Sequence, residues 1–251
     1  MTRFDDRSDI GRANCLAARD AIVVAPETAF VVTEALRWAS ATNGMYDPAA
    51  GKIVKLWDVN HRHEPPAAER ITSLAGRQLH RSVEVGTHRG QSVLRFHDPD
   101  VSLDLGAIAK GYAVDRAVNA LRRHAVTQAV VNAGGDLYAL GRAPDGEPWQ
   151  IGVRDPNDAR RVAQLLPVAD AAIGTSGTYM QFFRYRGHVY HHLMDPSIAA
   201  PRRTSMQSYT VRADRNLHAD VAASSLLGTP PAVANAILAK LVPGASVVSA
   251  I

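Results

Sequence analysis

Two segments of the sequence carry side chains suited to holding a phosphate and a metal ion. The first, SLDLGAIAKGYAVDRA at residues 102–117, places Asp104 before a turn of small residues and Lys110 in the first turn of an expected helix. Backbone N–H groups at a helix start attract anions, and a nearby lysine adds a full positive charge. Neither GxxxxGK[ST] nor GxGxxG is present, so the common nucleotide-binding loops do not apply. This segment predicts a phosphate site of another kind.

The second segment, HADVAASSLLG, contains Asp220 and Ser224 four residues apart. On a helix this spacing brings both side chains to one face. A carboxylate and a hydroxyl are hard oxygen donors that suit a Mg²⁺ ion whose other ligands are water and phosphate. The same pair is equally compatible with an ordinary first helical turn. It indicates a metal site only in combination with Asp104 and Lys110.

A histidine near the end of an expected hairpin is a third candidate. His192 lies close to Asp195 in the run YHHLMDP. Histidine titrates near neutral pH, and a carboxylate can fix its tautomer, so the position suits a general base. A surface histidine in a strand is the alternative interpretation.

Composition limits the class of protein. The 251 residues are 46% hydrophobic, which suffices for a large core, and the formal net charge is +4. Lysine and arginine are scattered without a dense basic run, so we expect no nucleic-acid partner. Cys15 is the single cysteine, which excludes an intrachain disulfide and a cysteine-based metal cluster.

The sequence contains no apolar run near the roughly 18 residues that a membrane span requires. Its first 20 residues are charged and lack the apolar core of a signal peptide. We therefore expect no membrane span and, for the chain as written, a cytoplasmic location. The same 20 residues are expected to form a polar, irregular lead-in.

Periodicity and turn residues predict an alternation of helices and strands. Helical spacing of apolar residues predicts helices over 27–44 and 108–124, and a small-residue helix containing Asp220. Short alternating runs over 71–106 and 171–196 predict antiparallel strands. The pair Gly134-Gly135 indicates either a close approach of another backbone or of a ligand, or a plain tight turn.

Several of these segments, in this order, resemble the FAD:protein FMN transferase (ApbE) family. They are DLGAIAKGYAVDRA, NAGGD, TSGTYMQFF, YHHLMDP and HADVAASSLLG. The earlier run GMYDPAAGKIVKLW is similar to the family segment GAFDPTVGPLVxLW. The resemblance implies one α+β domain over residues 1–251, of the T-fold-like type, with a mixed sheet and flanking helices.

The resemblance also implies an activity. It implies an enzyme that uses Mg²⁺ to transfer the FMN moiety of FAD to a threonine or serine hydroxyl of an acceptor flavoprotein, with release of AMP. Electrostatic positioning carries most of the catalysis in phosphoryl transfer of this kind. FAD and the acceptor flavoprotein are thus the expected partners.

Residue roles follow from the family's motifs. Met45, Tyr46, Asp47, Asp104 and Lys110 match FAD-contacting positions, although Asp47 before Pro48 also suits a simple turn. Three further residues match the family's metal-binding positions, with the first contributing its backbone carbonyl: Ala107, Asp220 and Ser224. His192 matches the histidine proposed to activate the acceptor.

The sequence departs from the family pattern in two places. The family begins with a strand bearing an MGT segment that has no counterpart here, so one flavin-contacting segment and an edge strand are expected to be missing. The family's DPRTGxP is replaced by DPSIAAP, which changes the acceptor side at Ser197, Ile198 and Ala199. These departures leave two alternatives: an FAD pyrophosphatase that releases FMN and AMP, or an FAD-binding protein without turnover.

Overall fold

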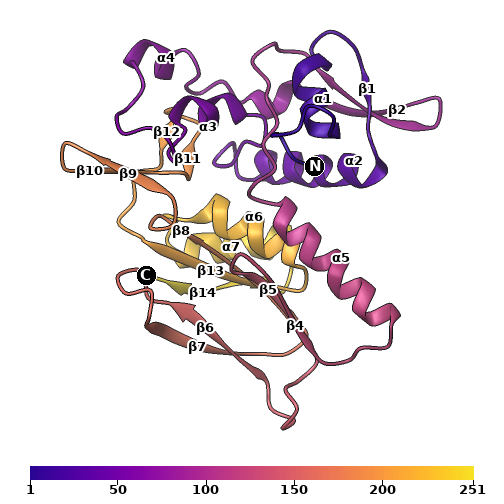
Figure 1. Cartoon of the computed structure of the whole chain (residues 1–251), viewed down its shortest axis with the longest axis vertical. Helices are drawn as coiled ribbons and strands as arrows, with labels where there is room; N and C mark the ends of the chain where they lie inside the picture. The colour runs from indigo at the N-terminus through magenta and orange to yellow at the C-terminus, as the bar shows by residue number, and fades with distance from the viewer. The chain divides into compact units, whose positions relative to one another are not determined.

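The computed structural model describes residues 1–251 and divides them into two compact units. Unit 1 comprises residues 1–106 and 180–203, and unit 2 comprises residues 107–179 and 204–251. Figure 1 traces the chain and labels its elements. The single domain expected over residues 1–251 stays a prediction.

Unit 1 is built from short helices, one three-stranded sheet and two small hairpins. Its first part contains α1 (Asp9–Leu16), β1 (Ile22–Val23), α2 (Pro26–Ala41), α3 (Gly51–Trp57), α4 (Ala68–Thr72), the 3-10 helix η1 (Leu79–Ser82), β2 (Val83–His88) and β3 (Gln91–Phe96). Its second part contains β9 (Phe182–Tyr185), β10 (His188–His191), β11 (Met194–Asp195) and β12 (Ala200–Pro201). The sheet has the order β1-β3-β2, and α2 packs against β2 and β3.

The prediction that residues 1–20 form an irregular lead-in is wrong, because this stretch contains helix α1. Ser8 caps the helix, since its Oγ accepts a hydrogen bond of 3.0 Å from the N–H of Gly11. Ile10 and Ala13 are fully buried and anchor the helix. With eight residues, α1 is too short to show a clear apolar period, and tertiary burial rather than propensity accounts for it.

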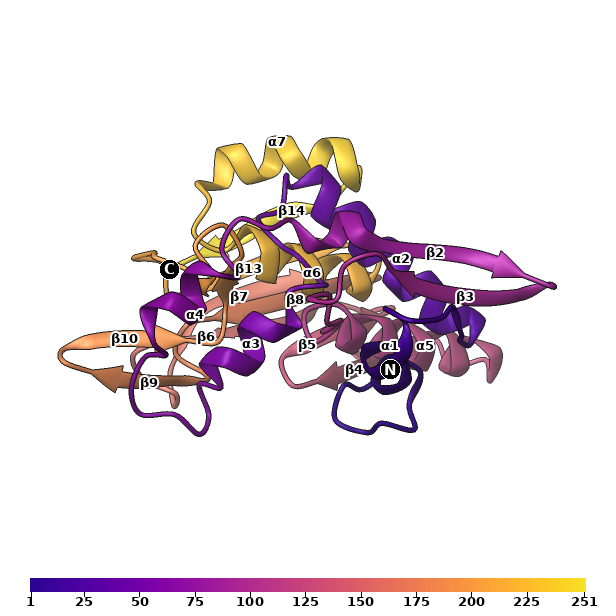
Figure 2. The same ribbon diagram turned by 90° about the horizontal axis from the view of Figure 1, so that it is seen from above.

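Unit 2 is organised around a five-stranded sheet. It contains α5 (Ala109–Arg123), β4 (Ala129–Ala133), β5 (Asp136–Leu140), β6 (Trp149–Arg154), β7 (Val162–Val168), β8 (Ala171–Gly177), β13 (Ser208–Ala213), α6 (Asn216–Leu226), α7 (Pro231–Leu241) and β14 (Ser246–Ala250). The sheet has the order β14-β13-β8-β5-β4. Helices α5 and α6 pack on it and on each other, and α7 lies against β14 (Figure 2).

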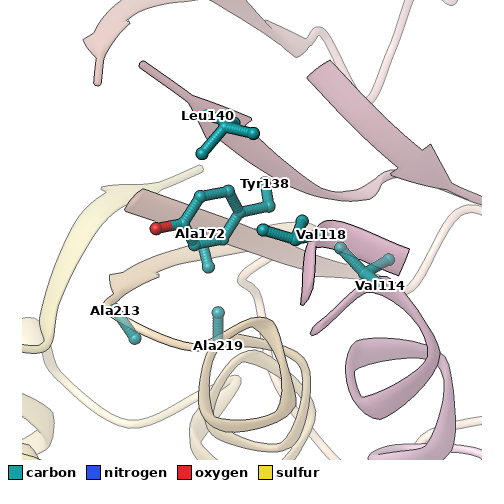
Figure 3. Packing of buried hydrophobic residues seen from close by; sticks show 7 residues of the cluster. All are labelled: Val114, Val118, Tyr138, Leu140, Ala172, Ala213 and Ala219. Atoms are coloured by element: carbon teal, nitrogen blue, oxygen red, sulfur yellow. The ribbon is translucent and has the colours of Figure 1, made fainter. Parts of the chain in front are cut away.

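Alternation along the strands gives this sheet two apolar faces. Figure 3 shows the cluster under the helices, which joins Tyr138 and Leu140 of β5 to residues of α5, β8, β13 and α6. Leu137 and Ala139 alternate with these two residues along β5 and pack on the other face of the sheet, against the β6–β7 hairpin. Successive strand residues point to opposite faces, so a strand covered on both sides is apolar throughout. This burial fixes β5, and with it the position of Asp136 at its start.

The predicted α+β class with helices flanking a sheet is confirmed, as are the helices predicted over 27–44 and 108–124. The sheet is antiparallel rather than mixed, because every pairing between its five strands is antiparallel. Gly134 and Gly135 form the tight turn between β4 and β5, with φ of 67° and 102°. A Cβ atom added to either glycine would have no other atom within 4 Å. The turn is therefore present and no other backbone lies close to it, whereas the close approach of a ligand to these glycines stays a prediction. No helix is long and apolar enough to cross a lipid bilayer.

Helix α6 lies unusually close to its neighbours in unit 2. A Cβ atom added to Gly111 of α5 would lie 2.3 Å from the carbonyl oxygen of Asn216, and one added to Gly174 of β8 would lie 2.4 Å from the backbone of Ala219. These contacts explain why both positions are glycine. Asp115 of α5 then caps α6, because its carboxylate accepts hydrogen bonds of 2.6 and 3.2 Å from the N–H groups of Asn216 and Leu217.

We expect Asp115→Ala to lower the free energy of unfolding by about 1–2 kcal/mol, because the first turn of α6 loses a buried capping carboxylate. Urea unfolding followed by circular dichroism measures the change. Asp214→Ala is the matched control, since this exposed aspartate immediately precedes the same helix. Equal stability of the two variants would contradict the capping role.

Candidate functional site

A lysine and two buried aspartates form an ionic cluster in unit 2. The Nζ atom of Lys110 lies 2.9 Å from Oδ1 of Asp220 and 3.2 Å from Oδ2 of Asp136. The second oxygen of Asp220 accepts a hydrogen bond of 2.9 Å from the N–H of Gly111. Both aspartate side chains are almost completely buried, whereas that of Lys110 is 43% exposed. The cluster therefore has a single charged group in contact with solvent.

Each member is held by a different element. Lys110 is in the first turn of α5, Asp136 begins β5 directly after the Gly134-Gly135 turn, and Asp220 is on α6. Asp136 is also fixed by Thr175 of β8, whose N–H donates to its Oδ1 over 3.2 Å. The close packing of α5 on α6 brings together residues that are 84 and 110 positions apart in the sequence.

The cluster holds more negative than positive charge when both aspartates are ionised. Burial, together with repulsion from Asp220, raises the pKa of Asp136 to about 7. Burial likewise raises the pKa of Asp220 despite its contacts with Lys110 and Gly111. Burial disfavours the ammonium of Lys110, but attraction by Asp220 and Asp136 outweighs it and raises the pKa of Lys110. An additional cation is therefore electrostatically favoured here.

The donors predicted for a metal ion all belong to unit 2. Ala107 precedes α5, and Asp220 and Ser224 lie on one face of α6. The Ser224 hydroxyl is 2.7 Å from that of Ser176 in β8, which orients it. No three side chains of histidine, cysteine, aspartate or glutamate gather into a metal-binding group. One carboxylate, one hydroxyl and one carbonyl fit Mg²⁺, which keeps water and phosphate ligands, better than Zn²⁺ or Ca²⁺.

The predicted flavin-contacting residues Met45, Tyr46 and Asp47 lie in unit 1, in the loop between α2 and α3. The Asp47 carboxylate is used internally: it accepts hydrogen bonds from the N–H of Ala49 at 2.8 Å and of His80 at 3.2 Å, and contacts Nδ1 of His80 at 3.1 Å. Its side chain is 2% exposed. The turn expected from Asp47 before Pro48 is thus present, and a ligand would meet this residue through its backbone.

Asp104 lies in unit 1 and is already paired. Its Oδ2 lies 2.8 Å from Nε of Arg3, and its Oδ1 accepts a hydrogen bond of 2.9 Å from the N–H of Gly106. No sequence pattern singles out Arg3 as this partner, because it lies in the N-terminal stretch for which the sequence predicts no regular structure. The role of Asp104 toward FAD stays a prediction.

His192 follows β10 in unit 1, next to a second histidine with a different environment. The Nδ1 atom of His192 lies 3.4 Å from the carbonyl oxygen of Gln181. A carbonyl only accepts, so Nδ1 carries the hydrogen in the neutral ring and Nε2 is the basic nitrogen. His192 is half-buried, whereas His191 is 5% exposed. The geometry thus favours His192 over His191 as a base.

His191 is a neutral structural residue. Its Nε2–H donates to the carbonyl oxygen of Arg202 over 2.9 Å, and its Nδ1 accepts from the N–H of Leu193 over 3.3 Å. Burial, reinforced by the neighbouring positive charges of His192 and Arg202, lowers the pKa of His191 to about 4. Protonation would oppose both the burial and the hydrogen bond at Nδ1.

We expect stability to fall as pH drops through the range in which unfolded His191 takes up a proton. The pKa of His191 is lower in the folded than in the unfolded chain. The stabilisation that the neutral His191 contributes to the free energy of unfolding is therefore complete above pH 6.5 and is lost toward pH 4. The shift corresponds to about 3 kcal/mol. Between pH 4 and 7, the free energy of unfolding of His191→Gln should depend less steeply on pH than that of the wild type. Exposed His88→Gln is the control, and parallel curves for His191→Gln and the wild type would contradict this assignment.

Comparisons with known proteins show which proteins this chain is similar to. Residues 1–248 match the model of the ApbE family. The chain is 32% identical over 234 residues to the FAD:protein FMN transferase of Treponema pallidum, covering 88% of this chain and 64% of the relative. It is 30% identical over 228 residues to that of Vibrio cholerae, covering 90% and 68%. The chain thus spans about two thirds of the length of these relatives.

Solved structures show the same fold. The ApbE protein of Thermotoga maritima superposes with a TM-score of 0.86 at 27% identity, covering 100% of this chain and 82% of that structure. The apo form of the flavinyl transferase ApbE of Pseudomonas stutzeri has a TM-score of 0.80 at 26% identity, covering 96% and 74%.

Proposed function

Because this chain belongs to the ApbE family, we propose that it is an Mg²⁺-dependent transferase that moves the FMN moiety of FAD to a threonine or serine hydroxyl of an acceptor flavoprotein and releases AMP. The names of the relatives support the reaction class. The observation that carries the proposal is the cluster of Lys110, Asp136 and Asp220, since two buried carboxylates share one ammonium there, and a cation that accompanies a diphosphate would balance the second carboxylate when both are ionised.

The metal would be held by the carboxylate of Asp220, the hydroxyl of Ser224 and the backbone carbonyl of Ala107. When bound, Mg²⁺ supplies neutralisation of the charge that develops on the diphosphate. Lys110 adds a second positive charge from the start of α5, and Asp136 holds that ammonium in place. Positioned charges of this kind stabilise a phosphoryl-transfer transition state without reorganising when it forms.

His192 would act on the acceptor. Its Nε2 would take the proton of the acceptor hydroxyl as the hydroxyl oxygen bonds to the phosphorus on the FMN side of FAD. The bond from this phosphorus to the oxygen bridging the two phosphates would break, and AMP would leave. The hydrogen bond from Nδ1 to Gln181 holds the ring in the tautomer that this step requires.

The test is incubation of the chain with FAD, Mg²⁺ and a protein or peptide carrying a flavinylation motif. A mass increase equal to one FMN moiety on the acceptor, lost when EDTA replaces Mg²⁺, is the expected result. Chromatography of the same reactions separates the alternatives: FMN and AMP released without an acceptor indicate a pyrophosphatase. FAD binding with no product in any reaction would indicate a binding protein without turnover.

A further inference from the structure

Arg202 connects two segments of unit 1 to which the proposed function assigns different roles. One is the loop of Met45, Tyr46 and Asp47, expected to contact the flavin nucleotide. The other is the segment around His192, expected to activate the acceptor. Arg202 directly follows β12, and it lies outside every motif used to recognise the family.

The side chain of Arg202 reaches the flavin loop. Its Nη2 donates a hydrogen bond of 2.6 Å to the carbonyl oxygen of Met45, 157 residues earlier in the sequence. Hydrogen bonds from a charged donor are shorter and about twice as strong as neutral ones. The backbone at Met45 is also held locally, since its N–H donates a hydrogen bond of 3.1 Å to the carbonyl oxygen of Thr42, and the bond from Arg202 adds a long-range constraint to this turn.

The backbone of Arg202 holds the histidine segment on both sides of His192. Its N–H donates to the carbonyl oxygen of Leu193 over 2.8 Å, and its carbonyl oxygen accepts from Nε2 of His191 over 2.9 Å. Each neighbour of His192 in the sequence is thus bonded to Arg202. A substitution of the side chain leaves these two backbone bonds in place, so its effect on the histidine segment comes from a shift of the Arg202 backbone once the anchor on Met45 is lost.

Arg202 is partly shielded from solvent and keeps its positive charge. The residue is half-buried, and burial lowers its pKa although the charge of Asp195 opposes the effect. A guanidinium remains charged under such conditions because its ordinary pKa is above 12. Its neighbour Arg203 is exposed, which provides a matched residue of the same type.

We propose that Arg202 is a positioning residue that couples the geometry of the flavin loop to that of the catalytic histidine, so that its loss impairs FAD binding and acceptor activation together. The inference rests on the proposed function for the roles of the two segments.

The test compares Arg202→Met with Arg203→Met in the full chain. Arg202→Met should weaken FAD affinity, measured by quenching of flavin fluorescence without acceptor, and lower kcat for transfer, each by about 10-fold, because small displacements of reacting groups are costly. Arg203→Met should leave both within about twofold. Arg202→Lys retains a charged donor and should recover part of both losses. Wild-type FAD affinity and kcat in Arg202→Met would overturn the proposal.

Hydrogen exchange measured by mass spectrometry provides a readout that does not need turnover. Arg202→Met should speed exchange in peptides covering residues 42–49 and 190–195 together, and Arg203→Met in neither. Faster exchange in one segment only, or in neither, would overturn the coupling. A wild-type chain that binds FAD without transferring FMN would contradict the proposed function instead, and the exchange and affinity measurements would still decide the role of Arg202.

Discussion

Asp220→Asn is expected to lower FMN transfer about 10³-fold while the protein remains folded, because this carboxylate is the one charged group among the proposed metal ligands Ala107, Asp220 and Ser224. Asparagine retains the volume and an oxygen that can accept from the N–H of Gly111. Lys110 keeps Asp136 as its partner, so no buried charge is left without a counter-charge. The substitution therefore separates metal binding from folding.

Steady-state transfer assays and thermal melting with and without Mg²⁺ check this expectation. The wild type should gain thermal stability when Mg²⁺ and FAD are added, and Asp220→Asn should gain much less, since ligand binding to the folded state raises its stability. Asp214→Asn, at an exposed position just before the same helix, should behave as the wild type. Undiminished Mg²⁺-dependent transfer by Asp220→Asn would refute the assignment of this residue as a metal ligand.

The sequence predicted local structure well where small residues and glycines recur in strong patterns. The helix containing Lys110 and the helix containing Asp220 and Ser224 were both predicted, because their apolar faces and turn residues lie within one segment. Helix α1 was missed because its eight residues are too few to show a clear apolar period before their burial is known. Local sequence patterns therefore predict helices and strands, but they do not show which of these elements pack against one another.

The partners of the site residues depend on contacts far apart in the sequence. Asp136 was visible in NAGGD, yet only the antiparallel pairing of β5 with β8 and the packing of α6 place it on Lys110. Asp47 suits either an FAD contact or a turn by sequence, and only the structure shows that its carboxylate is bonded to His80, 33 residues later. No periodic pattern encodes such pairings, because they arise when separate elements pack. The resemblance to the family supplied the candidate residues, and the structure shows which of them are already bonded to others.

His192→Gln is expected to lower transfer to the acceptor about 10²- to 10³-fold, the usual contribution of a general base, while FAD binding stays near that of the wild type. Glutamine still has an N–H to donate to the carbonyl of Gln181, so the segment keeps its hydrogen bond. The lost group is then the basic nitrogen alone. His188→Gln on β10, an exposed histidine of the same hairpin, is the control.

The same variant tests which acceptor the chain serves. If His192 activates a protein hydroxyl, its loss should reduce flavinylation far more than any slow release of FMN and AMP to water, because water needs no docking beside this ring to attack a diphosphate. Mass spectrometry of the acceptor and chromatography of the nucleotides, from one reaction, give the two rates. Equal reduction of both would mean that His192 acts on FAD itself, and unchanged flavinylation would place the base elsewhere in the protein.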